Sequence, residues 1–186
     1  ALGINVNATL IFSREQYGEV AEAFIAGLED RSAEGKPVSG IASVASLFVS
    51  RVDTAVDKLL ASGNCGGSLA GKIAVDNARA VYMDFETLFS GLRWRSLEEK
   101  GAQVQRPLWA STGTKNPGYS PTLYVDSLIG PHTVNTIPPA TLEAFLATGT
   151  VGMTVSSDRE GLKHRLGELK ALGISLDEVT GRLLKE

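Results

Sequence analysis

The sequence reads Arg106-Pro-Leu-Trp-Ala-Ser-Thr-Gly-Thr-Lys-Asn-Pro117 at the point that decides the fold, where a strand-like run passes into a polar loop. The apolar residues Val104, Leu108, Trp109 and Ala110 favour a buried parallel strand, in which hydrophobic runs replace strict alternation. The loop behind them holds three hydroxyls, an amide, an ammonium and a glycine. Parallel α/β folds bind ligands beyond the carboxyl ends of strands. We therefore expect an anion-binding loop, with an ordinary solvated loop as the alternative.

Strand and helix signals alternate along the rest of the chain. Besides the strand that ends at Ala110, apolar runs predict strands at Ile4–Phe12, Val44–Val49 and Thr133–Ile137. Helical spacing and caps predict helices from Ser13 to Asp30, Asp53 to Leu60, Ser68 to Phe89, Ser120 to Ile129, Ala140 to Leu146 and Asp158 to Leu172, and a last helix capped by Ser175 or Asp177.

Four strands, each followed by a helix, predict a parallel α/β sheet with right-handed crossovers, and four such units are half of a (β/α)8 TIM-type barrel. A complete barrel typically needs about 250 residues, whereas this chain has 186 and begins without methionine at a predicted strand. We therefore expect residues 1–186 to be a single unit, the carboxyl-terminal half of a longer barrel. Two open sheet edges and an uncovered face would make an isolated monomer unstable.

Composition excludes several functions. The net charge of −3 provides no broad basic field for nucleic acid, and the longest apolar runs are far short of a membrane span. With no signal-peptide pattern at its start, the protein is expected to be cytoplasmic. His132 and His164 lack ligand spacing, so no metal is expected. Cys65 is the single cysteine, and we interpret it as incidental.

One segment has the spacing of a phosphate-binding P-loop, namely Gly66-Gly-Ser-Leu-Ala-Gly71-Lys72. Ile73 stands where the motif needs a Ser or Thr to reach magnesium, and the residues before it indicate the end of a helix rather than a strand. A connection between helices is therefore the better interpretation.

Four motifs, in the same order, resemble the bacterial transaldolases of the pentose phosphate pathway. The longest is R-P-L-W-A-S-T-G-T-K-N-P-x-Y-S-x-T-L-Y-V from Arg106. The others are Gly3-Ile-Asn-Val-Asn-Ala-Thr-Leu-Ile-Phe-Ser13, Ser46-Leu-Phe-Val-Ser-Arg-Val-Asp53 and Thr133-Val-Asn-Thr-Ile-Pro-Pro-Ala-Thr141. The resemblance reaches from Gly3 to the closing segment Leu176–Thr180 and so covers nearly the whole chain.

The resemblance implies a transferase that carries a three-carbon dihydroxyacetone unit from a ketose phosphate to an aldose phosphate. It does so through a lysine Schiff base, without cofactor or metal. In the family this lysine lies on the strand before the one that matches Ile4–Phe12, upstream of Ala1. This chain alone is therefore expected to be inactive and to need a partner, either the missing amino-terminal half-barrel or another copy of the chain.

By the same resemblance, Arg51, Ser111 and Lys115 match positions that bind the sugar phosphate, a role suited to cations and hydroxyls. For Arg51 the alternative is a surface charge or a pair with Asp53. Lys115 could in principle form a Schiff base itself, but a polar, glycine-containing loop would keep its amine protonated.

The resemblance also assigns roles to polar residues on the strands. Asn7 and Ser46 match contacts to the substrate hydroxyls, and Thr9 matches a residue that positions the catalytic water. Polar strand residues inside a barrel are costly unless they are paired or face a ligand. A satisfied core amide or hydroxyl is the alternative for each.

Two other functions remain open at this point. One is a sugar-phosphate-binding or assembly half-barrel without turnover, which needs a partner chain. The other is a different class I aldolase that uses Lys115. Neither nucleic acid nor a membrane is an expected partner.

Overall fold

The computed structural model describes residues 2–63 and 67–185. It confirms an α/β fold with one parallel sheet of four strands in the order β1-β2-β3-β4. The strands are β1 (Val6–Ile11), β2 (Ser43–Phe48), β3 (Gln105–Ala110) and β4 (Val134–Asn135). The helices in the described residues are α1 (Arg14–Ala33), α2 (Ser50–Ser62), α3 (Ile73–Leu88), α4 (Leu92–Glu98), α5 (Leu123–Ser127), α6 (Pro139–Thr148), α7 (Arg159–Ala171) and α8 (Leu176–Leu183).

Side-chain caps start several of these helices, and the sequence predicts those of α1 and α8. The Ser13 hydroxyl accepts the Gln16 amide and the Gln16 side chain accepts the Ser13 amide, so the capping box of α1 is present. Asp158 caps α7 through the Gly161 amide. Of the two candidates for α8, Ser175 is the cap, because its hydroxyl accepts the Glu178 amide.

The predicted helix from Ser68 to Phe89 is too long at its start. Gly71 has a φ of +69°, a left-handed conformation that a continuous right-handed helix cannot contain. The chain therefore turns before Lys72, and α3 begins at Ile73. The sequence interpretation also missed α4, a short helix after Gly91 whose buried side chains are Trp94 and Leu97.

The helix of the third unit and the strand of the fourth are shorter than predicted. In place of a helix from Ser120 to Ile129, α5 covers only Leu123–Ser127. Past the end of α5, the Ile129 amide donates to the Thr154 hydroxyl at 3.2 Å, so a side chain takes the place of a helical carbonyl there. The predicted strand Thr133–Ile137 is reduced to β4, although the Thr136 amide still donates to the Trp109 carbonyl at 3.1 Å.

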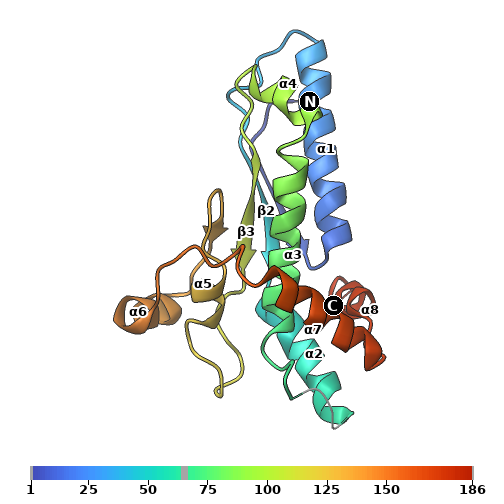
Figure 1. Ribbon diagram of the computed structural model, residues 1–186. Coiled ribbons are helices and arrows are strands. Elements are labelled where there is room, and N and C mark those ends of the chain that lie inside the picture. The colour runs from blue at the N-terminus through green and yellow to red at the C-terminus, as the bar shows by residue number, and fades with distance from the viewer. Residues whose placement is uncertain (1, 64–66, 186) are drawn as a thin grey trace.

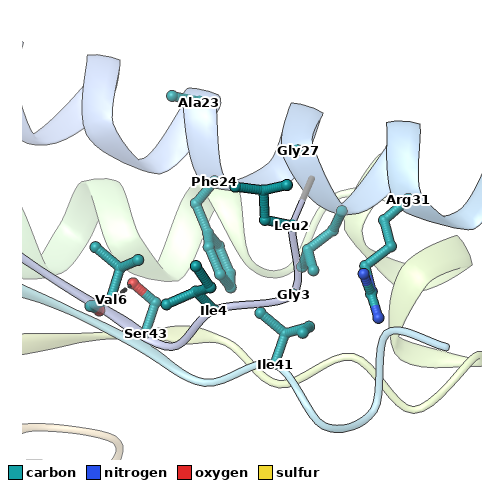
Figure 2. A pocket seen from close by; sticks show the side chains of 11 residues that line it. Leu2, Gly3, Ile4, Val6, Ala23, Phe24, Gly27, Arg31, Ile41 and Ser43 are labelled. Atoms are coloured by element: carbon teal, nitrogen blue, oxygen red, sulfur yellow. Dashed lines mark hydrogen bonds between the residues drawn. The ribbon is translucent and has the colours of Figure 1, made fainter. Parts of the chain in front are cut away.

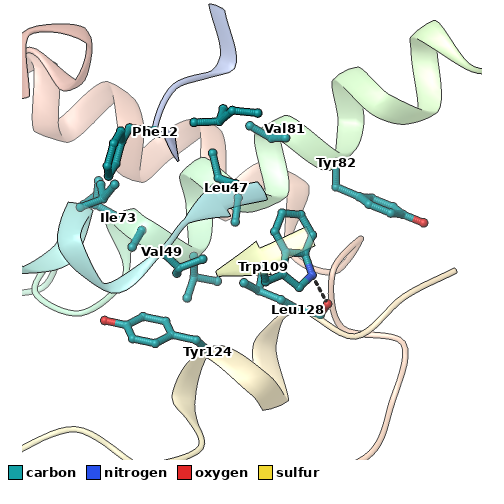
Figure 3. Close-up of a cluster of buried hydrophobic side chains, with 14 of the residues drawn as sticks. Phe12, Leu47, Val49, Ile73, Val81, Tyr82, Trp109, Tyr124 and Leu128 are labelled. Carbon is teal, nitrogen blue, oxygen red and sulfur yellow. Dashed lines mark hydrogen bonds between the residues drawn. The ribbon is translucent and has the colours of Figure 1, made fainter. Parts of the chain in front are cut away.

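The main core lies between the sheet and the helices α1, α2 and α3, with α1 and α3 running alongside the strands in Figure 1. Leu47 and Trp109 point from the sheet into this core, where Phe12 and Val81 lie close by in Figure 3. The Trp109 indole donates to the Leu128 carbonyl at 2.8 Å, so the ring satisfies its polar atom while buried.

A buried ion pair attaches α7, and with it the chain leading to α8, to α3. Asp76 on α3 is 1% exposed and accepts two hydrogen bonds of 2.6 Å from Arg165 on α7. Arg165 also contacts Asp158 at 2.8 Å. Such a bidentate pair fixes geometry as well as charge, so it holds α7 in one orientation against α3.

No helix in the described part of the chain combines the length and apolar character needed to cross a membrane.

The outer edge of β1 is open in the described residues, because β1 ends the strand order and pairs only with β2. Beside it, Leu2 is 91% exposed, Ile4 66% and Val6 53%. Figure 2 shows these side chains between α1 and the start of β2, around a hollow of about 340 Å³ with Phe24 and Ile41 in its wall. An exposed apolar edge of this kind is a template for another strand.

We expect the 186-residue chain to self-associate through this edge. Ile4→Lys should weaken the association about tenfold, because a charge replaces an apolar side chain buried between copies. Sedimentation equilibrium measures the effect. Leu146→Lys on α6 is the control, since Leu146 is also exposed, at 77%, but lies away from β1. Equal effects of both substitutions, or a wild-type chain that stays monomeric, would contradict the expectation.

Candidate functional site

The carboxyl ends of β2 and β3 lie side by side. Phe48 pairs with Ala110, and the Val49 and Ser50 amides donate to the Ala110 and Ser111 carbonyls at 2.9 and 3.1 Å. The hydroxyls of Ser50 and Ser111 are 2.8 Å apart. The start of α2 and the loop after β3 are therefore held next to each other at one end of the sheet.

Ser111 turns the chain out of the sheet, with a φ of +56° that is uncommon for a residue with a side chain. The next residue, Thr112, is fully buried, and its hydroxyl donates to the Asn135 side-chain oxygen at 2.8 Å. This bond joins the loop to β4. Asn135, a polar residue of β4, is thus a hydrogen-bonded partner of the loop.

Arg51 and Lys115, two of the predicted phosphate ligands, line the same hollow of about 590 Å³. Arg51 projects from the first turn of α2, with its guanidinium carbon 5.5 Å from the centre of the Phe48 ring. The structure gives Asp53 other partners, so it does not support the alternative of an Arg51–Asp53 pair. Ser111, the third predicted ligand, faces Ser50 and is not among the residues that line this hollow.

Two tyrosines attach the loop segment to α2. The Tyr119 hydroxyl donates to Asp57 at 2.7 Å, and the Tyr124 hydroxyl donates to Asp53 at 2.9 Å. Asp53 and Asp57 are one helical turn apart on α2 and so point in a similar direction. A small hollow of about 190 Å³ lies among these side chains, with Lys115 in its wall.

The carboxylates of this cluster also bind the chain before α3. Asp53 accepts the Ala74 amide at 2.8 Å, and Asp57 accepts the Gly71 amide at 3.1 Å. A Cβ at Gly71 would lie 2.8 Å from the Tyr119 ring. Gly71 therefore provides both the left-handed turn and the space for Tyr119. These two structural roles explain why a glycine stands at this position of the P-loop-like segment, and no bound nucleotide is needed to explain it.

Burial dominates the electrostatics of the cluster. It raises the pKa of Asp53 to about 6, although hydrogen bonds from Ala74 and Tyr124 act in the opposite direction. Burial also raises the pKa of Tyr119 to about 12, and it raises the pKa of Tyr124. Both tyrosines therefore remain neutral donors at physiological pH and hold the loop through their hydroxyls.

The predicted substrate-binding residues of the strands also meet. The Ser46 hydroxyl on β2 donates to the Asn7 side-chain oxygen on β1 at 2.6 Å. Thr9 lies at an irregularity of β1, where Ala8 pairs with Ala45 and Ile11 with Leu47, and Leu10 has a φ of +61°. Such a bulge re-aims side chains. Asn7 and Thr9 are exposed, whereas Ser46 is buried.

Sequence reasoning missed the cluster of Asp53, Asp57, Tyr119 and Tyr124. One signal could have found part of it, because Asp53 and Asp57 have the spacing of one helix face. The tyrosines gave no signal of their own, since each bonds a residue more than 60 positions away.

The sequence predicts neither a metal site nor a catalytic cysteine. Among the described residues, no group of three or more His, Cys, Asp or Glu could hold a metal ion. His132 lies near the Phe85 ring, and His164 is 80% exposed beside Glu168. Cys65 lies outside the described residues.

The whole sequence matches one protein family, described as Transaldolase/Fructose-6-phosphate aldolase, over residues 1–186. Transaldolase 1 of Streptomyces avermitilis is 50% identical over 188 residues, which cover 100% of this chain and 50% of that protein. The transaldolase of Saccharopolyspora erythraea is 49% identical, covering 100% of this chain and 51% of its own length. That of Thermobifida fusca is 48% identical, with 100% and 51% covered. The chain spans about half the length of these curated relatives.

The raised pKa of Asp53 predicts a pH dependence of stability. The native state binds a proton more tightly than the unfolded chain, so stability is lost as the pH rises from about 4, the ordinary pKa, through about 6. Between pH 4 and pH 7, the free energy of unfolding of the wild type should fall by roughly 2 kcal/mol relative to Asp53→Asn, which does not titrate.

Denaturant unfolding at several pH values measures this difference. Tyr124→Phe is a second variant for the same measurement. It removes the hydroxyl that lowers the pKa of Asp53, so the loss of stability should continue to higher pH. If the difference in the free energy of unfolding between the wild type and Asp53→Asn stays constant with pH, the prediction is contradicted.

Proposed function

The chain belongs to the Transaldolase/Fructose-6-phosphate aldolase family, and from this membership we propose that it provides the sugar-phosphate-binding half of a transaldolase. The activity is transfer of a three-carbon dihydroxyacetone unit between sugar phosphates through a lysine Schiff base, in the pentose phosphate pathway. In this proposal residues 1–186 form four units of a (β/α)8 barrel.

The observation that carries the proposal is the convergence of Arg51 and Lys115 on one hollow at the carboxyl ends of β2 and β3. Both side chains are exposed, so they can reach a ligand. A guanidinium offers two parallel donors to a phosphate, and an ammonium adds a mobile point charge. Ser111, in the same loop as Lys115, is proposed as a further ligand from the family match, although its hydroxyl faces Ser50 and it does not line the hollow.

One phosphate site is enough for both substrates. The dihydroxyacetone unit that is transferred carries no phosphate, so the phosphate of the donor leaves with the aldose product. The phosphate of the acceptor then takes the same place. Arg51 and Lys115 would thus hold each sugar by its far end and leave the reacting carbons free to meet the Schiff base.

Asn7, Ser46 and Thr9 are proposed to act at the sugar end. Asn7 accepts from Ser46, which leaves the Asn7 amide nitrogen free to donate to a sugar hydroxyl. Thr9, exposed next to the bulge of β1, would position the water that opens the Schiff base. These roles follow the family match of Asn7, Ser46 and Thr9.

The Schiff-base lysine is proposed to lie outside this chain. Such a lysine needs dry surroundings that lower the pKa of its amine. Every lysine of residues 1–186 is exposed, Lys115 included. This exposure supports a phosphate contact for Lys115 rather than a covalent role, and it makes a class I aldolase that uses Lys115 the weaker alternative.

The open edge of β1 is where the remaining half of the barrel is proposed to pair. Its exposed apolar residues suit a neighbouring strand, and relatives about twice as long as this chain have the length for further units.

The exposed lysines also fit a second function, a half-barrel that binds sugar phosphates without catalysing a reaction. Activity on adding the preceding half would favour the transaldolase, and binding without activity would favour the binder.

Titration calorimetry with fructose 6-phosphate tests the phosphate site. Arg51→Gln and Lys115→Gln should each weaken binding about 10- to 100-fold, because each removes a charge-assisted hydrogen bond. Lys100→Gln is the matched control, since Lys100 is exposed but donates to Ser32 and precedes β3 at the other end of the sheet. Unchanged affinity in both variants would exclude this site for the phosphate.

A further inference from the structure

The hollow that holds Arg51 and Lys115 is larger than one phosphate requires. Its volume of about 590 Å³ extends along α2 and reaches α8. Two more cations line it, Lys58 on α2 and Arg182 on α8. No carboxylate is among the described residues that form its wall, although the whole chain has a net charge of −3. The hollow is thus a local positive site on an otherwise acidic protein.

Lys58 and Arg182 are not needed for the sugar phosphate. Lys58 lies seven residues after Arg51 on α2, which places it about 10 Å further along the helix axis at the usual rise per residue. That separation exceeds the size of a single phosphate group. The second pair of cations therefore suits a second anionic group of the same ligand, on the side away from the sugar end.

The cations of the hollow are available to a ligand. Among the described residues, Arg51, Lys58 and Lys115 form no ion pair. Arg182 contacts Glu178 at 3.5 Å, but both side chains are about 70% exposed, and an exposed pair of this kind contributes little. The carboxylate of Asp57, next to Lys58 in the sequence of α2, accepts hydrogen bonds from Tyr119 and Gly71.

We propose that this hollow binds a condensed phosphate chain, held by Arg51 and Lys115 at one end and by Lys58 and Arg182 at the other. The inference rests on the proposed function, because it extends the same phosphate site. A triphosphate is long enough to follow the hollow along α2 and carries charge at both ends. Since it occupies Arg51 and Lys115, it competes with the sugar phosphate and inhibits its binding.

The test compares orthophosphate with tripolyphosphate by titration calorimetry at a fixed ionic strength of about 0.1 M, where charges beyond about 10 Å are screened. Tripolyphosphate should bind at least about tenfold more tightly and displace fructose 6-phosphate competitively. The double variant Lys58→Gln/Arg182→Gln should bring the affinity ratio to about one, with orthophosphate binding changed less than about twofold. Both residues are exposed, so the fold should persist, and circular dichroism checks it.

Lys100→Gln is again the control and should change neither affinity. A second arm uses ATP, since a condensed phosphate chain could belong to a nucleoside triphosphate or stand alone. ATP binding tighter than tripolyphosphate, lost in the same double variant, assigns the ligand to nucleotides. Weaker ATP binding assigns it to unsubstituted chains, and both results support the proposal.

Equal affinities for orthophosphate and tripolyphosphate in the wild type would overturn the proposal. So would a double variant that keeps the wild-type ratio, because the extra affinity would then come from elsewhere. These failures differ from failure of the proposed function, in which Arg51→Gln and Lys115→Gln leave fructose 6-phosphate binding unchanged.

Discussion

The pairing of β2 with β3 is the constraint on which the candidate site depends. Six consecutive residue pairs join the strands in register, from Ser43–Gln105 to Phe48–Ala110. Because the strands are parallel and end together, α2 and the loop of Lys115 leave the sheet at the same place. A shift of one residue would turn Leu47 and Trp109 out of the core, so burial of these side chains maintains the register.

The loop of Lys115 is polar and largely exposed, yet two tyrosine–aspartate bonds attach it to α2. This attachment has an electrostatic cost, because the buried Asp53 must stay ionised at neutral pH with a pKa raised to about 6. Hydrogen bonds from Tyr124 and Ala74 offset part of that cost. This attachment keeps Lys115 on the same hollow as Arg51. Without it, two flexible cations on separate elements would have no fixed positions relative to each other.

Much of the fold could be predicted from the sequence, because strands and helices follow from local patterns. The capping box of Ser13, the apolar run before Ser111 and the Ser175 cap are of this kind, and the structure confirms them. Of the site, the family resemblance predicted Arg51 and Lys115 as phosphate ligands, and both line one hollow. The Tyr119–Asp57 bond, the bulge at Leu10 and the approach of Arg182 depend on contacts between distant segments, which periodicity does not reveal.

Borohydride reduction in the presence of fructose 6-phosphate, followed by mass spectrometry of the chain and its peptides, tests the central claim most directly. A sample of the same protein is first titrated with fructose 6-phosphate to show that the sugar binds. A missing adduct then cannot be explained by a lack of binding. The account predicts binding without a reduced adduct, because no lysine here has the dry surroundings that a Schiff base needs. An adduct on Lys115, absent in Lys115→Ala, would contradict the account and make this chain a catalyst by itself.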